Sequence, residues 1–206
     1  MGKGERQTRP SGAPMSPVWG VIFSFFVAGC TIGPIQVNPF SFIAKVITVS
    51  MDARTKAEVT ADTKISAFAA MQLLDDEGSE WAGVRMLVFA QQVVIAGAVK
   101  SQVVKKRVEE VVRRDKTILY FSNELLVGNL GSFAPDTVLE AEINATLTAE
   151  PDVLSVNMRW SATGGQVVLM GVAGSRQEAN LAASKVRGIK GVKNLISRLR
   201  VVPAKN

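Results

Sequence analysis

The chain has 206 residues, 47% apolar and 20% charged, which is typical of a globular protein with one or two domains. It carries a formal net charge of +6, contains no histidine and has a single cysteine. One cysteine excludes an intramolecular disulfide and a multi-cysteine metal site, and without histidine no serine has the usual base of nucleophilic hydrolysis. We therefore predict a protein that is not an enzyme, with no catalytic residue, metal site or cofactor.

Residues 1–29 have the pattern of a signal peptide. Basic residues precede a short apolar run over 18–27, which is too short to cross a bilayer as a helix. The run ends in a lipobox made of Val27, Ala28, Gly29 and Cys30. This motif predicts cleavage before Cys30 and lipid attachment to it. Met15 is an alternative start, which would lack the basic residues of the segment.

Residues 30–60 are predicted to form the lipidated N-terminus and a tether. Thr31 follows the cysteine. In Gram-negative lipoproteins, whose lipobox this one resembles, aspartate at this place retains the protein at the inner membrane, so the resemblance implies the outer membrane for this chain. The apolar stretch Ile35–Val49 is interrupted by polar residues and a proline, so it does not predict a membrane span. It either lies on the membrane or packs on the domain that follows.

Residues 61–128 predict a first domain. Asp62 is the expected N-cap of a helix, and apolar residues at helical spacing follow it. Trp81–Ala90 and Gln92–Val99 predict a pair of strands, a valine stripe at 104–112 predicts a second helix, and Ile118–Val127 predicts the last strand.

Residues 135–203 predict a second domain after the short, turn-rich connection Gly128–Pro135. Asp136 starts a helix whose apolar face contains Leu139, Ile143 and Leu147, and two strands follow, with Trp160 and Met158 expected in the core. Ser175 and Glu178 have capping-box spacing at the start of the next helix. Gly188 and Gly191 end that helix, and the chain returns as a strand over 192–202.

The two domains are repeats of one pattern. A shift of 74 residues, without a gap, aligns 62–127 with 136–201, and 15 of these 66 pairs are identical. We predict an α+β fold of two tandem units. Each unit has the order helix, strand, strand, helix, strand, which makes a three-stranded mixed sheet packed by two helices.

These units resemble the BON domain (bacterial OsmY and nodulation). The strand Val167-Val168-Leu169-Met170-Gly171 and the later Gly191-Val192 pair have its pattern, and Ser122–Gly128 is similar to the end of first BON units. Asp52, Arg54 and Thr55 resemble a stretch that precedes them. In the first unit, Thr117-Ile118 replaces the Gly-Val pair, and Gln91-Gln92 stands at the expected glycine turn. With Cys30, the chain resembles dual-BON-domain outer-membrane lipoproteins.

Basic residues are concentrated at the C-terminal end. No acidic residue follows Glu178, whereas seven basic ones do: Lys185, Arg187, Lys190, Lys193, Arg198, Arg200 and Lys205. This asymmetry favours an anionic partner for the second domain. The resemblance implies anionic phospholipid, contacted through the domain's first helix, where Val138 occupies a position that is often aromatic. The predicted lipid-binding residues are Val138, Ile143, Lys190, Lys193, Arg198 and Arg200.

A second basic run, over 105–114, is interpreted as a solvated helix face, because Glu109 and Arg113 have the spacing of a helical ion pair. We expect neither nucleic acid nor a small-molecule substrate as a partner. The expected function is that of a lipoprotein on the periplasmic side of the outer membrane, anchored at Cys30. It would support envelope integrity by binding anionic phospholipid, the outer-membrane protein assembly machinery, or both. The alternative is a structural adaptor that binds another envelope protein or the cell wall without binding lipid.

Overall fold

The computed structural model describes residues 52–75, 80–129 and 136–202. The chain divides into a unit of residues 1–36 and a unit of residues 37–206, and every described residue belongs to the second. The predicted signal peptide, the lipobox with Cys30, the stretch Ile35–Val49 and residues 130–135 of the connection lie outside the described residues.

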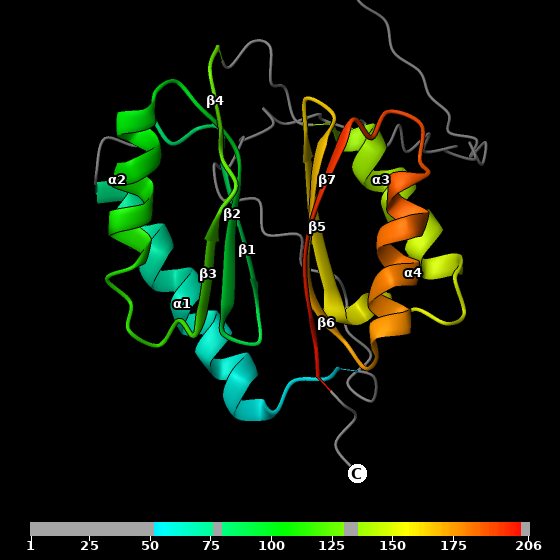
Figure 1. The fold of residues 1–206 in the computed structure, drawn as a ribbon. Helices are drawn as coiled ribbons and strands as arrows, with labels where there is room; N and C mark the ends of the chain where they lie inside the picture. The colour runs from blue at the N-terminus through cyan, green and yellow to red at the C-terminus, as the bar shows by residue number, and fades with distance from the viewer. Residues whose placement is uncertain (1–51, 76–79, 130–135, 203–206) are drawn as a thin grey trace, which may run out of the picture. The chain divides into compact units, whose positions relative to one another are not determined.

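The described chain forms two successive repeats of helices and strands (Figure 1). The first contains α1 (Lys56–Asp75), β1 (Val84–Phe89), β2 (Gln92–Val99), α2 (Gln102–Val112), β3 (Tyr120–Asn123) and β4 (Leu126–Val127). The second contains α3 (Thr137–Ala149), the 3-10 turn η2 (Ser155–Asn157), β5 (Met158–Thr163), β6 (Gln166–Ala173), α4 (Arg176–Arg187) and β7 (Asn194–Val201). The fold is therefore α+β, with four helices and two mixed sheets in the described ranges.

Each sheet has its longest apolar strand in the centre. β6 pairs antiparallel with β5 and parallel with β7, and β2 pairs antiparallel with β1 and parallel with β3 and β4. A parallel pair needs a crossover connection, which α4 and α2 provide. The sequence offset of 74 residues holds in the strand pairing, because Val84 faces Gly97 in the first sheet and Met158 faces Gly171 in the second.

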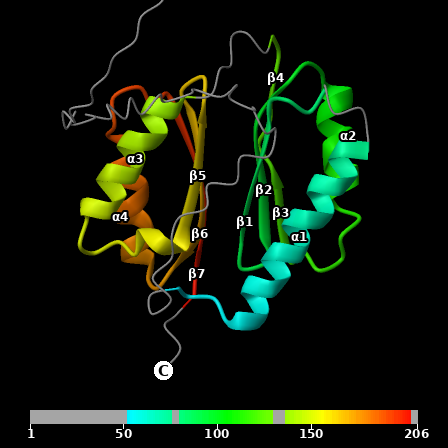
Figure 2. The same ribbon diagram turned by 180° about the vertical axis from the view of Figure 1, so that it is seen from behind.

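Two helices cover one face of each sheet (Figure 2). In the first repeat, the predicted stripe of α2 is buried against the sheet together with Ile65 and Ala69 of α1. In the second, Leu139, Ile143 and Leu147 of α3 pack with Ala182 and Val186 of α4 around Trp160. The predicted core faces of these helices are confirmed.

A third core joins the two repeats. The strand residues that alternate away from the helices are also apolar, and they form one buried cluster. Its members are Leu87, Phe89, Ala90, Val94 and Ala96 from the first repeat and Val168, Met170 and Val172 from the second. β2 is buried along its whole length and β6 everywhere except Gln166, which explains why both read as continuous apolar runs.

Three predicted boundaries are wrong in the first repeat. α1 begins at Lys56, so Asp62 lies inside the helix and is not its N-cap. Thr55 takes that role, because its Oγ1 accepts from the Glu58 backbone N–H at 3.2 Å while Glu58 accepts from the Thr55 N–H at 2.6 Å. β1 begins three residues after Trp81, which is buried in a turn.

The third correction concerns the last strand, which is broken into β3 and β4 at Glu124 and Leu125. Leu125 is buried in the first core, and its backbone N–H donates to the Asn123 side chain instead of to a neighbouring strand. The break turns Glu124 toward the second repeat, where its backbone carbonyl accepts from Gln166 Nε2 at 3.1 Å.

Candidate functional site

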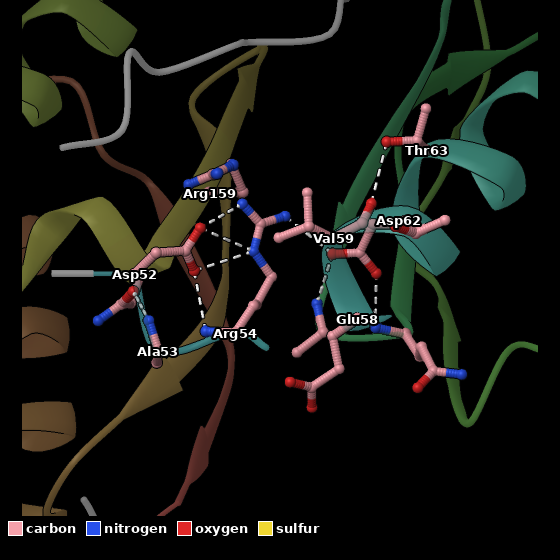
Figure 3. A network of polar contacts seen from close by, with 12 residues as sticks. Asp52, Ala53, Arg54, Glu58, Val59, Asp62, Thr63 and Arg159 are labelled. Atoms are coloured by element: carbon pink, nitrogen blue, oxygen red, sulfur yellow. Dashed lines mark hydrogen bonds and ion pairs between the residues drawn. The ribbon is translucent and has the colours of Figure 1, made fainter. Parts of the chain in front are cut away.

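A polar network lies where the segment before α1 meets both repeats (Figure 3). The Arg54 guanidinium forms ion pairs with Asp52 at 2.7 Å and with Asp62 at 2.9 Å. All three side chains are at most 10% exposed. Burial opposes the ionisation of Asp52, but its hydrogen bonds to Arg54 and the charge of that residue outweigh burial and lower the pKa of the carboxyl.

Asp62 also holds the turn between β1 and β2. Its carboxylate accepts from the backbone N–H groups of Ala90 at 2.8 Å and Gln91 at 2.7 Å. Both turn residues have left-handed backbones, with φ of 50° and 56°, in place of the two glycines at 164 and 165 in the second repeat. The carboxylate therefore stabilises a turn that the sequence of the first repeat does not favour by itself.

The same network reaches the second repeat. The Ala53 N–H donates to Asn157 Oδ1 at 2.9 Å, and the guanidinium groups of Arg54 and Arg159 lie 4.4 and 4.9 Å from the centroid of the Phe89 ring. Burial, with Arg54 nearby, lowers the pKa of Arg159 to about 10, so this side chain stays charged at neutral pH. The network joins segments that are distant in the chain, and the sequence did not predict it.

Two of the predicted lipid-binding residues contact the first repeat instead. Arg198 forms an ion pair with Glu124 at 2.7 Å. Arg200 donates to Gln92 Oε1 at 3.1 Å and lies 4.0 Å from the Tyr120 ring centroid. These arginines therefore act in the contact between the repeats.

Of the other four predicted residues, one is buried and three are exposed. Ile143 has an exposed fraction of 0% and belongs to the core of the second repeat. Val138, in the first turn of α3, is 82% exposed, and Lys190 and Lys193 are exposed on the loop between α4 and β7. The structure thus brings Val138, Lys190 and Lys193 together at one end of the second repeat and does not place Ile143, Arg198 or Arg200 there.

Packing around two glycines fixes this end. The Leu139 side chain lies against Gly191, and Lys193 packs along Gly165 with its Nζ 3.5 Å from the Gly164 carbonyl oxygen. Asp136 accepts from the Gly165 N–H at 2.6 Å. The start of α3, the β5–β6 turn and the α4–β7 loop consequently lie at the same end of the repeat, as Figure 1 shows.

We call Val138, Arg187, Lys190 and Lys193 the basic end. Arg187, the last residue of α4, is exposed. Lys185 is not included, because it forms an ion pair with Glu150 at 2.5 Å. Asp136 at this end is engaged by the Gly165 backbone, and Glu142 lies one turn further along α3. An exposed aliphatic side chain beside three cations can contact an anionic surface that has an apolar interior.

The basic run of α2 is a helix face, as predicted. Arg113 pairs with Glu109 at 2.9 Å, and Lys105 donates to the Leu125 carbonyl oxygen at 2.7 Å. Within the described ranges, no cluster of His, Cys, Asp or Glu is placed to hold a metal ion. None of the helices in the described part of the chain has the length and apolar composition needed to cross a membrane.

Comparison with known proteins identifies the second repeat. Residues 135–203 match the BON domain family. The chain is 30% identical over 129 residues to the uncharacterized protein in gshII 5'region of Anaplasma centrale, covering 61% of this chain and 85% of that protein. It is 26% identical over 144 residues to the osmotically-inducible protein Y of Escherichia coli strain K12, covering 68% and 72% of the two chains.

Among solved structures, a likeness is found to CdsD, a structural protein of the type III secretion system of Chlamydia trachomatis. The identity is 16% and the TM-score 0.30, over 69% of this chain and 65% of that one. This TM-score does not show a common fold, and the chain spans less than two thirds of that protein. The sequence relationships show the family: the chain belongs to the same family as the Anaplasma centrale protein, and its residues 135–203 are a BON domain.

Proposed function

We propose that the protein is a non-catalytic lipoprotein on the periplasmic side of the outer membrane, anchored at Cys30, and that its basic end binds anionic phospholipid to support envelope integrity. The BON domain, the similarity to an osmotically-inducible protein and the lipobox at 27–30 support this proposal. We further propose that the first repeat is a second, more divergent BON domain, since its element order and strand register repeat those of the second.

The observation that carries the lipid contact is the exposure of Val138, Lys190 and Lys193 at the same end of the second repeat. A lysine near an anionic leaflet contributes about 1 kcal/mol to the free energy of membrane binding, and full burial of a valine side chain in the membrane contributes roughly 1.5 kcal/mol or more. Together these contacts give an affinity only near the millimolar range. Such a contact is weak but measurable at millimolar lipid concentrations, and it adds to the acyl anchor, which itself binds marginally.

The anchor is tested by intact mass spectrometry of protein extracted from membranes. We expect a mature N-terminus at Cys30 carrying a diacylglyceryl group, and an uncleaved precursor for the Cys30→Ala variant. A mature protein that begins at Met1 would contradict the anchor.

The lipid contact is tested by sedimentation with vesicles, using residues 31–206, which contain every described element. We expect binding to mixed phosphatidylcholine–phosphatidylglycerol vesicles, little binding to phosphatidylcholine alone, and a steep loss of binding with added salt. Replacing Lys190 and Lys193 by glutamine should weaken binding. The charge-matched control, Lys106→Gln with Arg176→Gln, removes two exposed cations outside the basic end and should bind more tightly than that variant.

Indifference to the anionic lipid would refute the lipid contact and favour the adaptor alternative. In that case the protein would bind another envelope protein, such as a component of the assembly machinery, or the cell wall.

A further inference from the structure

The first repeat has an open pocket at the end where its β1–β2 turn lies. The pocket has a volume of about 430 Å³ and is lined by Lys56, Thr60 and Lys64 of α1 together with Gln91 and Thr117. Gln91 Nε2 donates to the Thr117 carbonyl oxygen at 2.9 Å, and the Gln91 carbonyl oxygen accepts from the Leu119 N–H at 2.9 Å. The turn and the loop before β3 are thus fixed beside α1.

This end is the counterpart of the basic end under the offset of 74 residues. Lys116 corresponds to Lys190, while Lys64 takes the position of Val138 and Leu119 that of Lys193. An exposed aliphatic side chain with lysines nearby therefore occurs at both ends, although the aliphatic residue comes from a helix in one repeat and from a loop in the other. Leu119 is 64% exposed.

The lysines of this end are exposed, and the carboxylates near them are held by local hydrogen bonds or by Arg54. In the described part of the chain, Lys56 and Lys64 form no ion pair. Asp62 is bound by Arg54, the Asp115 carboxylate accepts from the Thr117 N–H at 2.9 Å, and Glu58 accepts from the Thr55 N–H. We call Lys56, Lys64, Lys116 and Leu119 the first-repeat end.

We propose that the first-repeat end is a second site for an anionic phospholipid surface, so that the protein contacts two such surfaces at once. The first of these contacts is the one proposed above for the basic end, and this inference rests on it. The occupant is a bilayer because the end combines exposed lysines with an exposed leucine, and these match the charged headgroups and the apolar interior of a membrane.

The two ends lie at opposite ends of one strand. The Lys193 N–H, just before β7, donates to Gly165 of the β5–β6 turn, whereas Arg200, near the end of β7, donates to the Ala90 carbonyl oxygen of the β1–β2 turn at 3.2 Å. A strand rises about 3.3 Å per residue, which separates the two turns by roughly 23 Å along β7. A surface that meets one end face-on therefore leaves the other end free for a second surface.

The anchored tether joins the protein at the first-repeat end. Asp52 to Thr55 lead directly into Lys56 at the rim of the pocket. The 21 residues that separate Cys30 from Asp52 span at most about 70 Å. Such a tether lets either end reach the membrane that holds the anchor, and the other end is then available to a second anionic surface.

Vesicle clustering tests this inference separately from binding. Residues 31–206 are mixed with phosphatidylcholine–phosphatidylglycerol vesicles; flotation measures the bound fraction and light scattering measures clustering. We expect the wild-type chain both to bind and to cluster vesicles. The variant with Lys56→Gln, Lys64→Gln and Leu119→Ser should still bind through the basic end but lose clustering, because two lysine contacts change affinity by roughly 30-fold.

The matched control removes the same chemistry elsewhere in the first repeat, with Lys100→Gln, Lys106→Gln and Val103→Ser. It should cluster vesicles as the wild type does. Clustering that survives in the first-repeat-end variant would overturn the inference, as would a wild-type chain that binds without clustering. A wild-type chain that binds no anionic vesicle would instead refute the function proposed for the basic end.

Discussion

At the scale of single residues, Arg54 connects the segment before α1 and α1 itself with the distant strands β1 and β5. It pairs with Asp52 just before α1 and with Asp62 inside α1, and it stacks on Phe89 of β1 beside Arg159 of β5. A buried cation is tolerated only when its donors find acceptors, and here two carboxylates supply them. The short stretch from Asp52 to Thr55 is thus part of the fold.

We predict that Arg54→Ala lowers the free energy of unfolding by about 3 kcal/mol, because Asp52 and Asp62 then lie buried without their cationic partner. Urea unfolding followed by circular dichroism measures the change. Arg54→Lys keeps the charge but loses the forked geometry, so its free energy of unfolding should lie between those of Arg54→Ala and the wild type. Equal stability of Arg54→Ala and the wild type would show that the network contributes nothing.

The contribution of Asp52 to the stability of the protein depends on pH with a defined sign. Since the pKa of Asp52 is lower in the folded protein than its ordinary value of 3.8, the unfolded chain binds more protons in this range. The stability that Asp52 contributes is present above pH 3.8 and is lost as the pH falls through the lowered folded value. Urea unfolding should therefore show the wild type more stable than Asp52→Asn above pH 3.8, and the difference should shrink below it. A constant difference would contradict this assignment.

At the scale of elements, a glycine lets the central strand of each sheet approach the chain before the first strand. A Cβ on Gly171, where φ is +127°, would lie 2.1 Å from the Asn157 carbonyl oxygen, and one on Gly97 would lie 2.0 Å from that of Gly83. We predict that Gly171→Ala destabilises the protein by about 3 kcal/mol or more, because backbone must move.

The control for that substitution is Gly174→Ala, three residues later and just after β6, where the nearest atom to a new Cβ is a flexible Glu178 oxygen at 3.6 Å. Urea unfolding of both variants measures the difference. Gly174→Ala should change the free energy of unfolding by no more than about 0.5 kcal/mol. Similar effects of the two alanines would show that the close approach at Gly171 does not exist.

Local patterns in the sequence predicted the elements well. The stripe of α2 and the Ser175 cap depend on residues near one another, and the offset of 74 residues is a repetition of such local patterns; the structure has all three. The role of Asp62 was missed because its partners, Arg54 and the β1–β2 turn, are brought to it only by the tertiary fold. The same reason applies to Arg198 and Arg200, whose charges pointed to an external anion although Glu124 and Gln92 bind them.

At the scale of the whole molecule, the repeats share a core and should unfold together. Val94 and Ala96 of β2 and Val168 and Met170 of β6 are each at most 1% exposed. Because these apolar side chains would be exposed to water if the repeats separated, the stability of each repeat depends on the other. The sequence did not predict this, because alternation in a strand shows that both faces are apolar but not what covers the second face.

Residues 31–206 contain one tryptophan in each repeat, Trp81 and Trp160, so fluorescence can follow the repeats separately. In variants that keep only one of them, with the other replaced by phenylalanine, the two urea transitions should coincide. Adding Met170→Asp should lower both midpoints equally. A shift confined to the Trp160 transition would show that the repeats are independent domains.

The exposed start of α3 is proposed to enter an anionic membrane, and a fluorescent probe at Val138 reports on that contact. Residues 31–206 lack cysteine, so Val138→Cys can be labelled uniquely with a polarity-sensitive fluorophore. Phosphatidylglycerol-containing vesicles should shift its emission to the blue, and a quencher in the acyl chains should dim it. The same label at Val103, which is 75% exposed on α2, should respond to neither. Equal responses at both positions, or no response at Val138, would show that the start of α3 does not enter the membrane.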